Sequence, residues 1–234
     1  MLSQKVFSQQ AARLYNKIGL RHEKLRAEDK KIDQEITRLF KFLPKNLRGK
    51  TVLDAGCGSG IFSQALLKRG AERVICLDIS EAMLNLARRR KRKFKLEGLH
   101  IVRDDLTRTK FKSKSFDIIL AIFSLPYIID LENIFKEFRR ILKDKGLVFI
   151  ASNYFRIKRE SLLHTKVKYI LGDIKLIGII HTIEEYLDTA ESNRFLIKDF
   201  FTNKEPHGLK INPSYKDKNL VKIHSFSAVL TKGL

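Results

Sequence analysis

The segment 54–60, with the sequence Asp-Ala-Gly-Cys-Gly-Ser-Gly, is the sharpest chemical feature of the chain. Its three glycines allow the backbone to turn tightly and to come close to a ligand. The segment follows a short apolar strand expected over 51–54 and opens an amphipathic helix expected over 59–69, whose first N–H groups have no partner within the helix. This arrangement favours a site for a nucleotide-like ligand.

A carboxylate is expected close to this turn. Asp78 ends the next expected strand, 73–78, and comes 18 residues after Gly60. A carboxylate at that strand end can accept hydrogen bonds from both ribose hydroxyls of an adenosine. A dinucleotide site would need a glycine at position 61, where this chain has Ile61, so the spacing disfavours a nicotinamide-dependent oxidoreductase.

The pattern Asp-x-Gly-x-Gly-x-Gly resembles motif I of the class I S-adenosylmethionine-dependent methyltransferases. The resemblance covers about residues 7–150 and continues weakly to about residue 200. Phe7-Ser8-x-x-Ala11-x-x-x-Tyr15 is similar to the leading helix of the small-molecule branch, the type 11 group. Further segments resemble the family's later motifs: 77–83, 103–106, 115–119, 140–147 and 181–187.

The resemblance implies an α/β fold with a Rossmann-like seven-stranded methyltransferase sheet, mostly parallel with an antiparallel last strand, and a helical N-terminal cap. The alternation of apolar strands and amphipathic helices along the chain independently favours a parallel sheet covered on both sides. Strands are expected at 51–54, 73–78, 99–103, 116–122, 146–151, 195–201 and 221–230, and helices at 59–69, 80–95, 131–142 and 182–192. We expect one domain, 1–234, divided into the cap 1–48, the cofactor-binding core 49–152, a cap insertion 153–181, and a C-terminal helix with edge strands 182–234.

The same resemblance implies S-adenosylmethionine as cofactor and S-adenosylhomocysteine as product. In the family's arrangement Asp78 would bind the ribose, Ile79 and Met83 would flank the adenine, and Asp105 would accept a hydrogen bond from the adenine amino group. The complete set of implied cofactor contacts is Tyr15, Asp54, Gly56, Cys57, Gly58, Gly60, Asp78, Ile79, Met83, Asp105, Leu106 and Ala121.

The acceptor side departs from the family. After the fourth strand the family often carries a polar residue and later a His, where this chain has Ala121-Ile122 and Pro126-Tyr127. The remaining candidates for acceptor contacts or catalysis are Tyr15, Tyr127, His181 and Tyr186, and Tyr15 is equally open to a packing role. A base is needed only if the acceptor must lose a proton.

The chain carries 47 Lys and Arg against 26 Asp and Glu, a net charge of +21, and six consecutive cations run from Arg88 to Lys93. We expect a small-molecule or acyl-carrier-bound acceptor, because the leading helix is similar to that of carrier-directed methyltransferases and a basic surface suits an acidic carrier. The alternative is an RNA or protein methyltransferase that uses this basic surface. Base composition of the genome and a solvated helix end would also account for the charge.

The two cysteines, Cys57 and Cys76, are expected as reduced thiols, which favours a cytoplasmic protein. The six histidines are scattered along the sequence, so we expect no metal site. We expect neither a signal peptide nor a transmembrane segment, since no apolar run approaches the roughly 20 residues that a bilayer requires.

Overall fold

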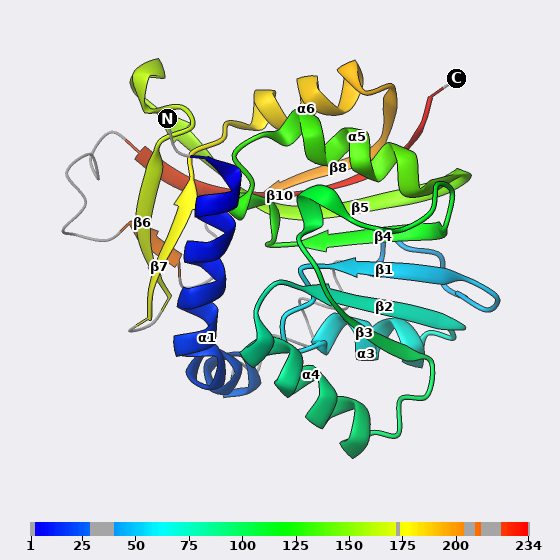
Figure 1. Ribbon diagram of the computed structural model, residues 1–234. Helices are drawn as coiled ribbons and strands as arrows, with labels where there is room; N and C mark the ends of the chain where they lie inside the picture. The colour runs from blue at the N-terminus through cyan, green and yellow to red at the C-terminus, as the bar shows by residue number, and fades with distance from the viewer. Residues whose placement is uncertain (1–2, 29–39, 172–173, 204–208, 212–220, 234) are drawn as a thin grey trace.

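The computed structural model describes residues 3–28, 40–171, 174–203, 209–211 and 221–233 (Figure 1). Its helices are α1 (Gln4–Glu28), α3 (Ile61–Lys68), α4 (Glu81–Lys93), α5 (Leu131–Ile141) and α6 (Ile183–Ser192), with short 3-10 turns η1 (Leu106–Arg108), η2 (Leu125–Tyr127) and η3 (Glu160–Leu162). Its strands are β1 (Thr51–Ala55), β2 (Arg73–Asp78), β3 (Leu99–Arg103), β4 (Phe116–Ile122), β5 (Leu142–Ile157), β6 (Lys166–Leu171), β7 (Ile174–Ile179), β8 (Phe195–Asn203), β9 (Leu209–Ile211) and β10 (Val221–Lys232).

The main sheet has seven strands in the order β3-β2-β1-β4-β5-β10-β8. The strands from β3 to β5 pair in parallel, and β10 runs antiparallel to both of its neighbours, β5 and β8. The fold class expected from the sequence is therefore confirmed. After β1 the chain adds β2 and β3 on one side of β1, and it then adds β4 on the other side. The strand order therefore reverses between β1 and β4. Ligands of open α/β sheets bind at such a switch point, beyond the carboxyl ends of the strands.

Alternation of side chains along the strands produces two apolar cores, one on each face of the sheet. On one face Leu53 and Ile119 pack with α5 and α6, and on the other Val52 and Leu120 pack with α3 and α4. Because β4 is buried on both faces, its residues 118–122 form a continuous apolar run in the sequence. The two layers of helices hold β1 and β4 in place, and with them the loops that follow these strands.

A second sheet, which the sequence did not predict, lies beside the carboxyl ends of the main strands. It has three strands in the order β7-β6-β9 and occupies much of the segment that we expected to be a cap insertion. Val167 and Leu176 of this sheet form a third apolar cluster, against which Leu14 and Ile18 of α1 pack. The second sheet and α1 therefore support each other, and together they border the switch point (Figure 1).

Side chains cap the starts of two helices. Ser80 caps α4, and Thr182 caps α6 by accepting a hydrogen bond from the Glu185 N–H. The Glu185 side chain does not complete a capping box, because it contacts two histidines instead. Of the helical cap expected over 1–48, residues 1–2 and 29–39 lie outside the described residues.

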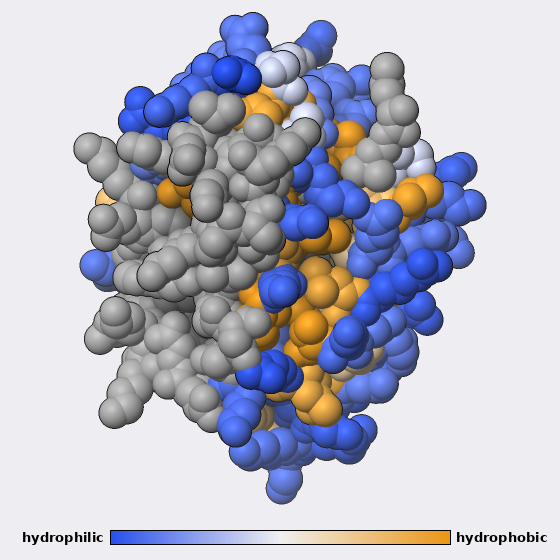
Figure 2. Space-filling view, turned by 90° about the vertical axis from the view of Figure 1, so that its left-hand side faces the viewer, coloured by the Kyte–Doolittle hydropathy of each residue, from blue (hydrophilic) through white to orange (hydrophobic). Residues whose placement is uncertain are grey.

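Among the residues that the structure describes, none forms a helix long and apolar enough to cross a membrane. Figure 2 shows the face formed by α1 and the second sheet, where a band of hydrophobic side chains lies among hydrophilic ones.

Candidate functional site

The glycine turn between β1 and α3 has the backbone conformation that its composition predicts. Gly56, Gly58 and Gly60 have φ angles of 76°, 54° and 77°, in the left-handed region that glycine adopts without strain. Space is also restricted, since a Cβ at Gly56 would lie 2.5 Å from the Cβ of Ser124, and one at Gly58 would lie 3.0 Å from the Cε of Met83. Both positions therefore require glycine.

Asp78 connects this turn to the start of α4. Its Oδ2 accepts a hydrogen bond from the Gly58 N–H at 2.9 Å, and its Oδ1 accepts one from the Ser80 N–H at 2.8 Å. Burial raises the pKa of Asp78, while the N–H groups of Ser80 and Gly58 oppose the rise. Each carboxylate oxygen has a second lone pair that can accept a further hydrogen bond. The arrangement can bind a vicinal diol at the turn.

Asp54, on β1, is buried and accepts a hydrogen bond from the Ser63 hydroxyl at 2.5 Å. Its pKa is raised to about 7, mainly because burial disfavours the charged form, and the nearby charge of Asp78 adds to the rise while the hydrogen bond from Ser63 opposes it. Asp54 therefore carries a proton over much of the acidic range. Its contacts fix the end of β1 rather than reach an open space.

Helix α1 is attached at both ends to the rim of the switch point. Near its start, the Gln4 side chain donates to the Tyr127 carbonyl at 3.1 Å and accepts from the Ile129 N–H at 2.6 Å. Near its end, Glu23 accepts a hydrogen bond from the Ser59 hydroxyl in the glycine turn and forms an ion pair with Arg90 of α4. The helix thereby crosses the carboxyl ends of the strands (Figure 1).

Between these attachments, Asn16 of α1 accepts hydrogen bonds from the Ser80 hydroxyl at 2.8 Å and the Ala82 N–H at 3.1 Å. The neighbouring residue, Tyr15, points to the other side of the switch point, where its hydroxyl lies 2.8 Å from that of Tyr127. Their rings meet edge to face with centroids 5.6 Å apart. Two of the four expected acceptor-side residues are therefore brought together.

The other two expected acceptor-side residues, His181 and Tyr186, are buried. The His181 Nε2 lies 2.6 Å from the Ile128 carbonyl oxygen, and the Tyr186 hydroxyl lies 3.2 Å from that of Ser152. Burial raises the pKa of Tyr186, which keeps its phenol neutral. Both residues connect the start of α6 to the core, and their contacts stabilise the fold.

The remaining expected cofactor contacts surround the turn at the edge of the sheet. Met83, Leu106 and Ala121 are buried, and Ile79 follows β2 directly. Asp105 has a local role that the sequence did not reveal, because its carboxylate caps η1 by accepting hydrogen bonds from the Thr107 N–H and hydroxyl at 2.9 and 2.7 Å.

One residue that the sequence analysis missed is Ser124, in the loop after β4. Its hydroxyl is buried and has no hydrogen-bond partner within the described residues, and it lies against Gly56. The preceding residue, Phe123, has a φ of 54°, a conformation that non-glycine residues rarely adopt and that is found at functional sites. The family often carries a polar residue soon after the fourth strand, and Ser124 is such a residue. The family resemblance pointed instead to positions 121–122 and 126–127, where this chain has no matching residue.

The expectation of two reduced thiols was wrong. Cys57 of the glycine turn and Cys76 of β2 form a disulfide, with Cα atoms 5.3 Å apart. The reason lies in the register of the sheet, in which Cys76 is the partner of Asp54 on the adjacent strand. A separation of 19 residues gave no hint of this proximity, because it spans a full strand–helix–strand unit.

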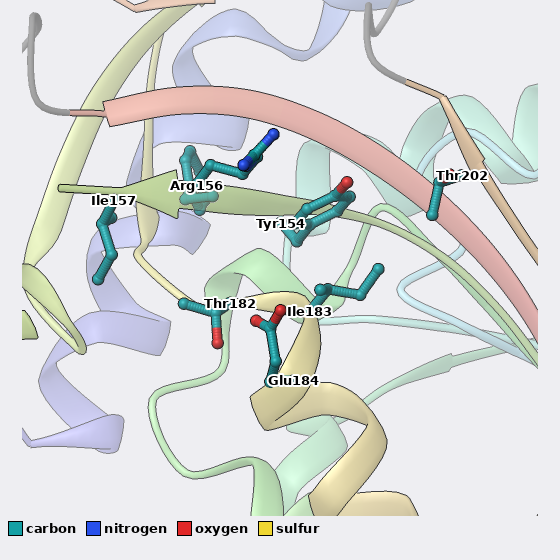
Figure 3. A pocket seen from close by; sticks show the side chains of 8 residues that line it. Tyr154, Arg156, Ile157, Thr182, Ile183, Glu184 and Thr202 are labelled. Atoms are coloured by element: carbon teal, nitrogen blue, oxygen red, sulfur yellow. The ribbon is translucent and has the colours of Figure 1, made fainter.

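A separate cavity of about 410 Å³ lies between the end of β5, the start of α6 and β8 (Figure 3). The labelled side chains of Tyr154, Arg156 and Glu184 give it a partly polar lining. It contains none of the expected site residues, and β4 separates β5 from β1 and the glycine turn. We assign it no part in the candidate site.

Half of the basic run in α4 has structural partners. Arg88 pairs with Glu81, Arg90 pairs with Glu23 and donates to the Ser59 carbonyl, and Lys91 donates to the Leu99 carbonyl. These three cations help to hold α4 and α1, and they are not all free to attract a polyanion.

Comparison with known proteins gives a consistent result. Residues 53–150 match a family model described as a methyltransferase domain. The chain is 31% identical over 180 residues to a ubiquinone biosynthesis O-methyltransferase of Pasteurella multocida, which covers 71% of this chain and 72% of the relative. It is also 36% identical over 112 residues to a ribosomal protein L11 methyltransferase of Thermoanaerobacter pseudethanolicus, but this match covers only 48% of this chain and 34% of the relative.

Two solved structures share the fold over nearly the whole chain. A geranyl diphosphate C-methyltransferase from Streptomyces coelicolor has a TM-score of 0.73 at 17% identity, covering 97% of this chain and 98% of that one. The [4+2]-cyclase SpnF also has a TM-score of 0.73, at 14% identity and 97% coverage of both chains. At these identities the likeness concerns the fold alone.

The buried carboxyl group of Asp54 generates a prediction about stability and pH. Its pKa rises from 3.8 to about 7 on folding, so the native state holds a proton that the unfolded chain releases between these values. Wild-type protein should therefore lose stability relative to Asp54→Asn as the pH rises from 4 to 7, by up to about 1.4 kcal/mol per pH unit. Urea denaturation at several pH values measures this difference. An identical pH dependence in the two proteins would contradict a neutral buried Asp54.

Proposed function

The chain belongs to the class I S-adenosylmethionine-dependent methyltransferases, and from this premise we propose that it transfers the methyl group to a hydroxyl of a small-molecule acceptor held beneath α1. The observation that carries the proposal is the juxtaposition of Asp78, at the glycine turn, with the Tyr15–Tyr127 hydroxyl pair across the switch point. S-adenosylmethionine-dependent methylation is the established part of this statement, and the acceptor is our inference.

We assign the cofactor to the carboxyl ends of β1, β2 and β4. The residues here fit it, because Asp78 offers two carboxylate oxygens to a ribose diol and the glycine turn leaves no Cβ in the way. The unpartnered hydroxyl of Ser124, close to Gly56, suits the polar methionine end of the cofactor. The other expected contacts complete the surroundings: Tyr15, Asp54, Cys57, Gly60, Ile79, Met83, Asp105, Leu106 and Ala121.

When bound, S-adenosylmethionine supplies an electrophilic methyl group on a sulfonium that is already a good leaving group. The main work of the protein is consequently to align the acceptor and to exclude water. Helix α1 suits both tasks, since Gln4 and Glu23 attach it at opposite sides of the site. Tyr15 and Tyr127 would orient the acceptor oxygen through their hydroxyls, and His181 and Tyr186 would support them from the core.

The choice of a small hydroxylated acceptor rests on how far each similarity extends. The match to the O-methyltransferase of Pasteurella multocida reaches well beyond the cofactor-binding core, over 71% of the chain. The match to the protein-directed enzyme stops at 48%. Acceptor recognition in this fold depends on the parts outside the core.

The alternative, an RNA or protein acceptor, depends on the basic charge, which would also suit an acyl-carrier-bound form of a small acceptor. Arg89, Arg92 and Lys93 are the exposed members of the run in α4. They would produce a steep dependence of binding on salt if a polyanion docked there. An acceptor screen with methyl-labelled S-adenosylmethionine, using hydroxylated aromatic compounds, a phosphopantetheinylated acyl carrier and total RNA as separate arms, distinguishes these classes.

The cofactor assignment predicts the effect of Asp78→Ala on S-adenosylhomocysteine binding. Loss of two charge-assisted hydrogen bonds to the ribose should weaken binding on the order of 100-fold or more. Isothermal titration calorimetry on wild type and variant measures this loss, with Asp188→Ala on the exposed face of α6 as the matched control. Equal affinity in wild type and Asp78→Ala would show that the carboxylate does not hold the ribose.

The acceptor assignment predicts a different pattern for Tyr127→Phe. The ring keeps its packing but loses the hydroxyl, so kcat/KM for the acceptor found in the screen should fall on the order of tenfold. Affinity for S-adenosylhomocysteine should stay at the wild-type value. Tyr154→Phe, in the separate cavity of Figure 3, serves as the control and should leave both quantities unchanged. The reverse result, with Tyr154→Phe impaired and Tyr127→Phe active, would move the acceptor to that cavity.

A further inference from the structure

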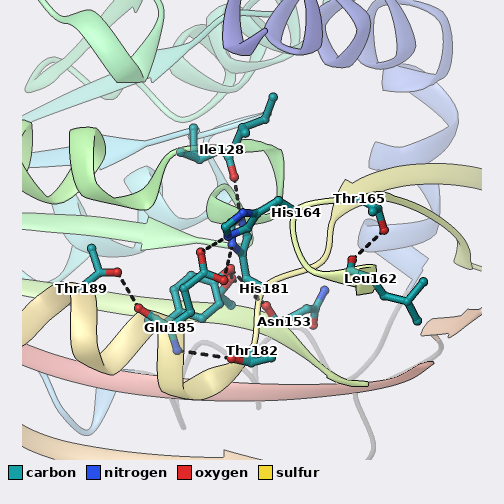
Figure 4. A network of polar contacts seen from close by, with 12 residues as sticks. Ile128, Asn153, Leu162, His164, Thr165, His181, Thr182, Glu185 and Thr189 are labelled. Atoms are coloured by element: carbon teal, nitrogen blue, oxygen red, sulfur yellow. Dashed lines mark hydrogen bonds and ion pairs between the residues drawn. The ribbon is translucent and has the colours of Figure 1, made fainter. Parts of the chain in front are cut away.

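A cluster of three potential metal ligands lies apart from the expected cofactor contacts and includes one expected acceptor-side residue, His181. It consists of His164, in the loop after η3, and of His181 and Glu185, at the start of α6 (Figure 4). Backbone hydrogen bonds place the two histidines side by side, because the His164 N–H donates to the Ile180 carbonyl at 2.9 Å and the Ile180 N–H donates to the Thr165 carbonyl at 3.0 Å. The rings are 5.6 Å apart between centroids.

The protonation of His181 is set by its surroundings. Its side chain is completely buried, and its Nε2 lies 2.6 Å from the Ile128 carbonyl oxygen, which can only accept a hydrogen bond. Nε2 must therefore carry the proton, and in the neutral ring Nδ1 is left with a lone pair. Nδ1 faces the Glu185 Oε2 at 3.0 Å, yet neither atom has a hydrogen-bond partner among the residues that the structure describes. Two buried acceptor atoms that face each other call for a cation or a proton between them.

Glu185 and His164 supply the rest of the donor set. The Glu185 Oε1 lies 2.7 Å from the His164 Nε2. The His164 ring is 55% exposed, which leaves the cluster open to solvent on one side.

We propose that His164 Nε2, His181 Nδ1 and the Glu185 carboxylate form a binding site for a divalent transition metal of the zinc class. The three donor atoms lie within 4.8 Å of one another. A tetrahedral ion with bonds of about 2.0–2.1 Å would place its ligands about 3.3 Å apart, so shifts on the order of 1 Å would bring all three onto one ion. Two imidazoles and one carboxylate suit zinc, cobalt or nickel better than magnesium or calcium, which prefer oxygen ligands alone.

In many metal sites a ligating histidine is held by a hydrogen bond from its other ring nitrogen, and His181 already has such a bond. A ligating histidine almost always donates its other ring N–H to a carbonyl or carboxylate, and His181 does so toward Ile128. Ile128 follows η2, which contains Tyr127. A bound ion would thus connect the loop after η3 with the start of α6 and, through the contact of His181 with Ile128, with the end of η2. None of its ligands belongs to the set of expected cofactor contacts, and His181 supports the acceptor side only indirectly, through Ile128. The role of the ion would therefore be structural.

Direct metal binding tests the proposal without any activity assay. Chelator-treated protein is titrated with zinc chloride by calorimetry and with cobalt chloride by visible absorption, in the wild type and in His164→Ala and Glu185→Gln. Matched controls are His100→Ala, another exposed histidine, and Glu184→Gln, the neighbouring exposed carboxylate. Circular dichroism and S-adenosylhomocysteine binding verify that each variant is folded.

The expected result is one saturable zinc site per chain, weakened on the order of 100-fold or more in both ligand variants and unchanged in both controls. Zinc should also raise the melting temperature of the wild type and leave that of His164→Ala unchanged. The proposal is overturned if folded wild type shows no saturable site, or if His164→Ala binds zinc as tightly as wild type. The contact between His181 and Glu185 would then be an imidazolium–carboxylate ion pair that needs no metal.

Discussion

The carboxylate of Asp78 is the contact on which the geometry of the site depends. It accepts one hydrogen bond from the glycine turn and one from the start of α4, and so fixes two segments that would otherwise move independently. The turn can make this contact because Gly58 adopts a left-handed conformation, with a φ of 54°, that other residues rarely adopt. A carboxylate that is already held in place loses little conformational freedom when it binds a ligand, which is the physical advantage of a preorganised site.

Helix α1 adds a second constraint, because it joins the two halves of the site. Gln4 contacts the segment after β4, Asn16 contacts the start of α4, and Glu23 contacts both the glycine turn and Arg90. The residue next to Asn16 is Tyr15, so the same helix that borders the cofactor side also supplies one of the two acceptor-side hydroxyls. If the acceptor binds where we propose, its position is coupled to that of the cofactor through a single helix.

The sequence predicted the features that follow from local chemistry. The glycine turn, the strand ending at Asp78 and the strand over 116–122 each depend on a few neighbouring residues, and all are present. The antiparallel pair formed by β8 and β10 was predicted correctly because no long helix separates them.

What the sequence could not predict depends on contacts between distant segments. The Cys57–Cys76 disulfide follows from the register of β1 and β2. The approach of His164 to His181 follows from the second sheet, whose strands mix apolar and basic residues without a clear alternation of hydrophobicity. The turn before β8 is a further case: Arg194 has a left-handed φ of 55°, and its carbonyl accepts hydrogen bonds from the distant residues Arg139 and Gly233.

The most direct test of the central claim is a crystal structure of the protein with S-adenosylhomocysteine. The account predicts that both ribose hydroxyls lie within hydrogen-bond distance of the Asp78 carboxylate, and that the ligand's sulfur faces the space below Tyr15 and Tyr127. A ligand bound elsewhere, or bound at the glycine turn with its ribose away from Asp78, would contradict the account.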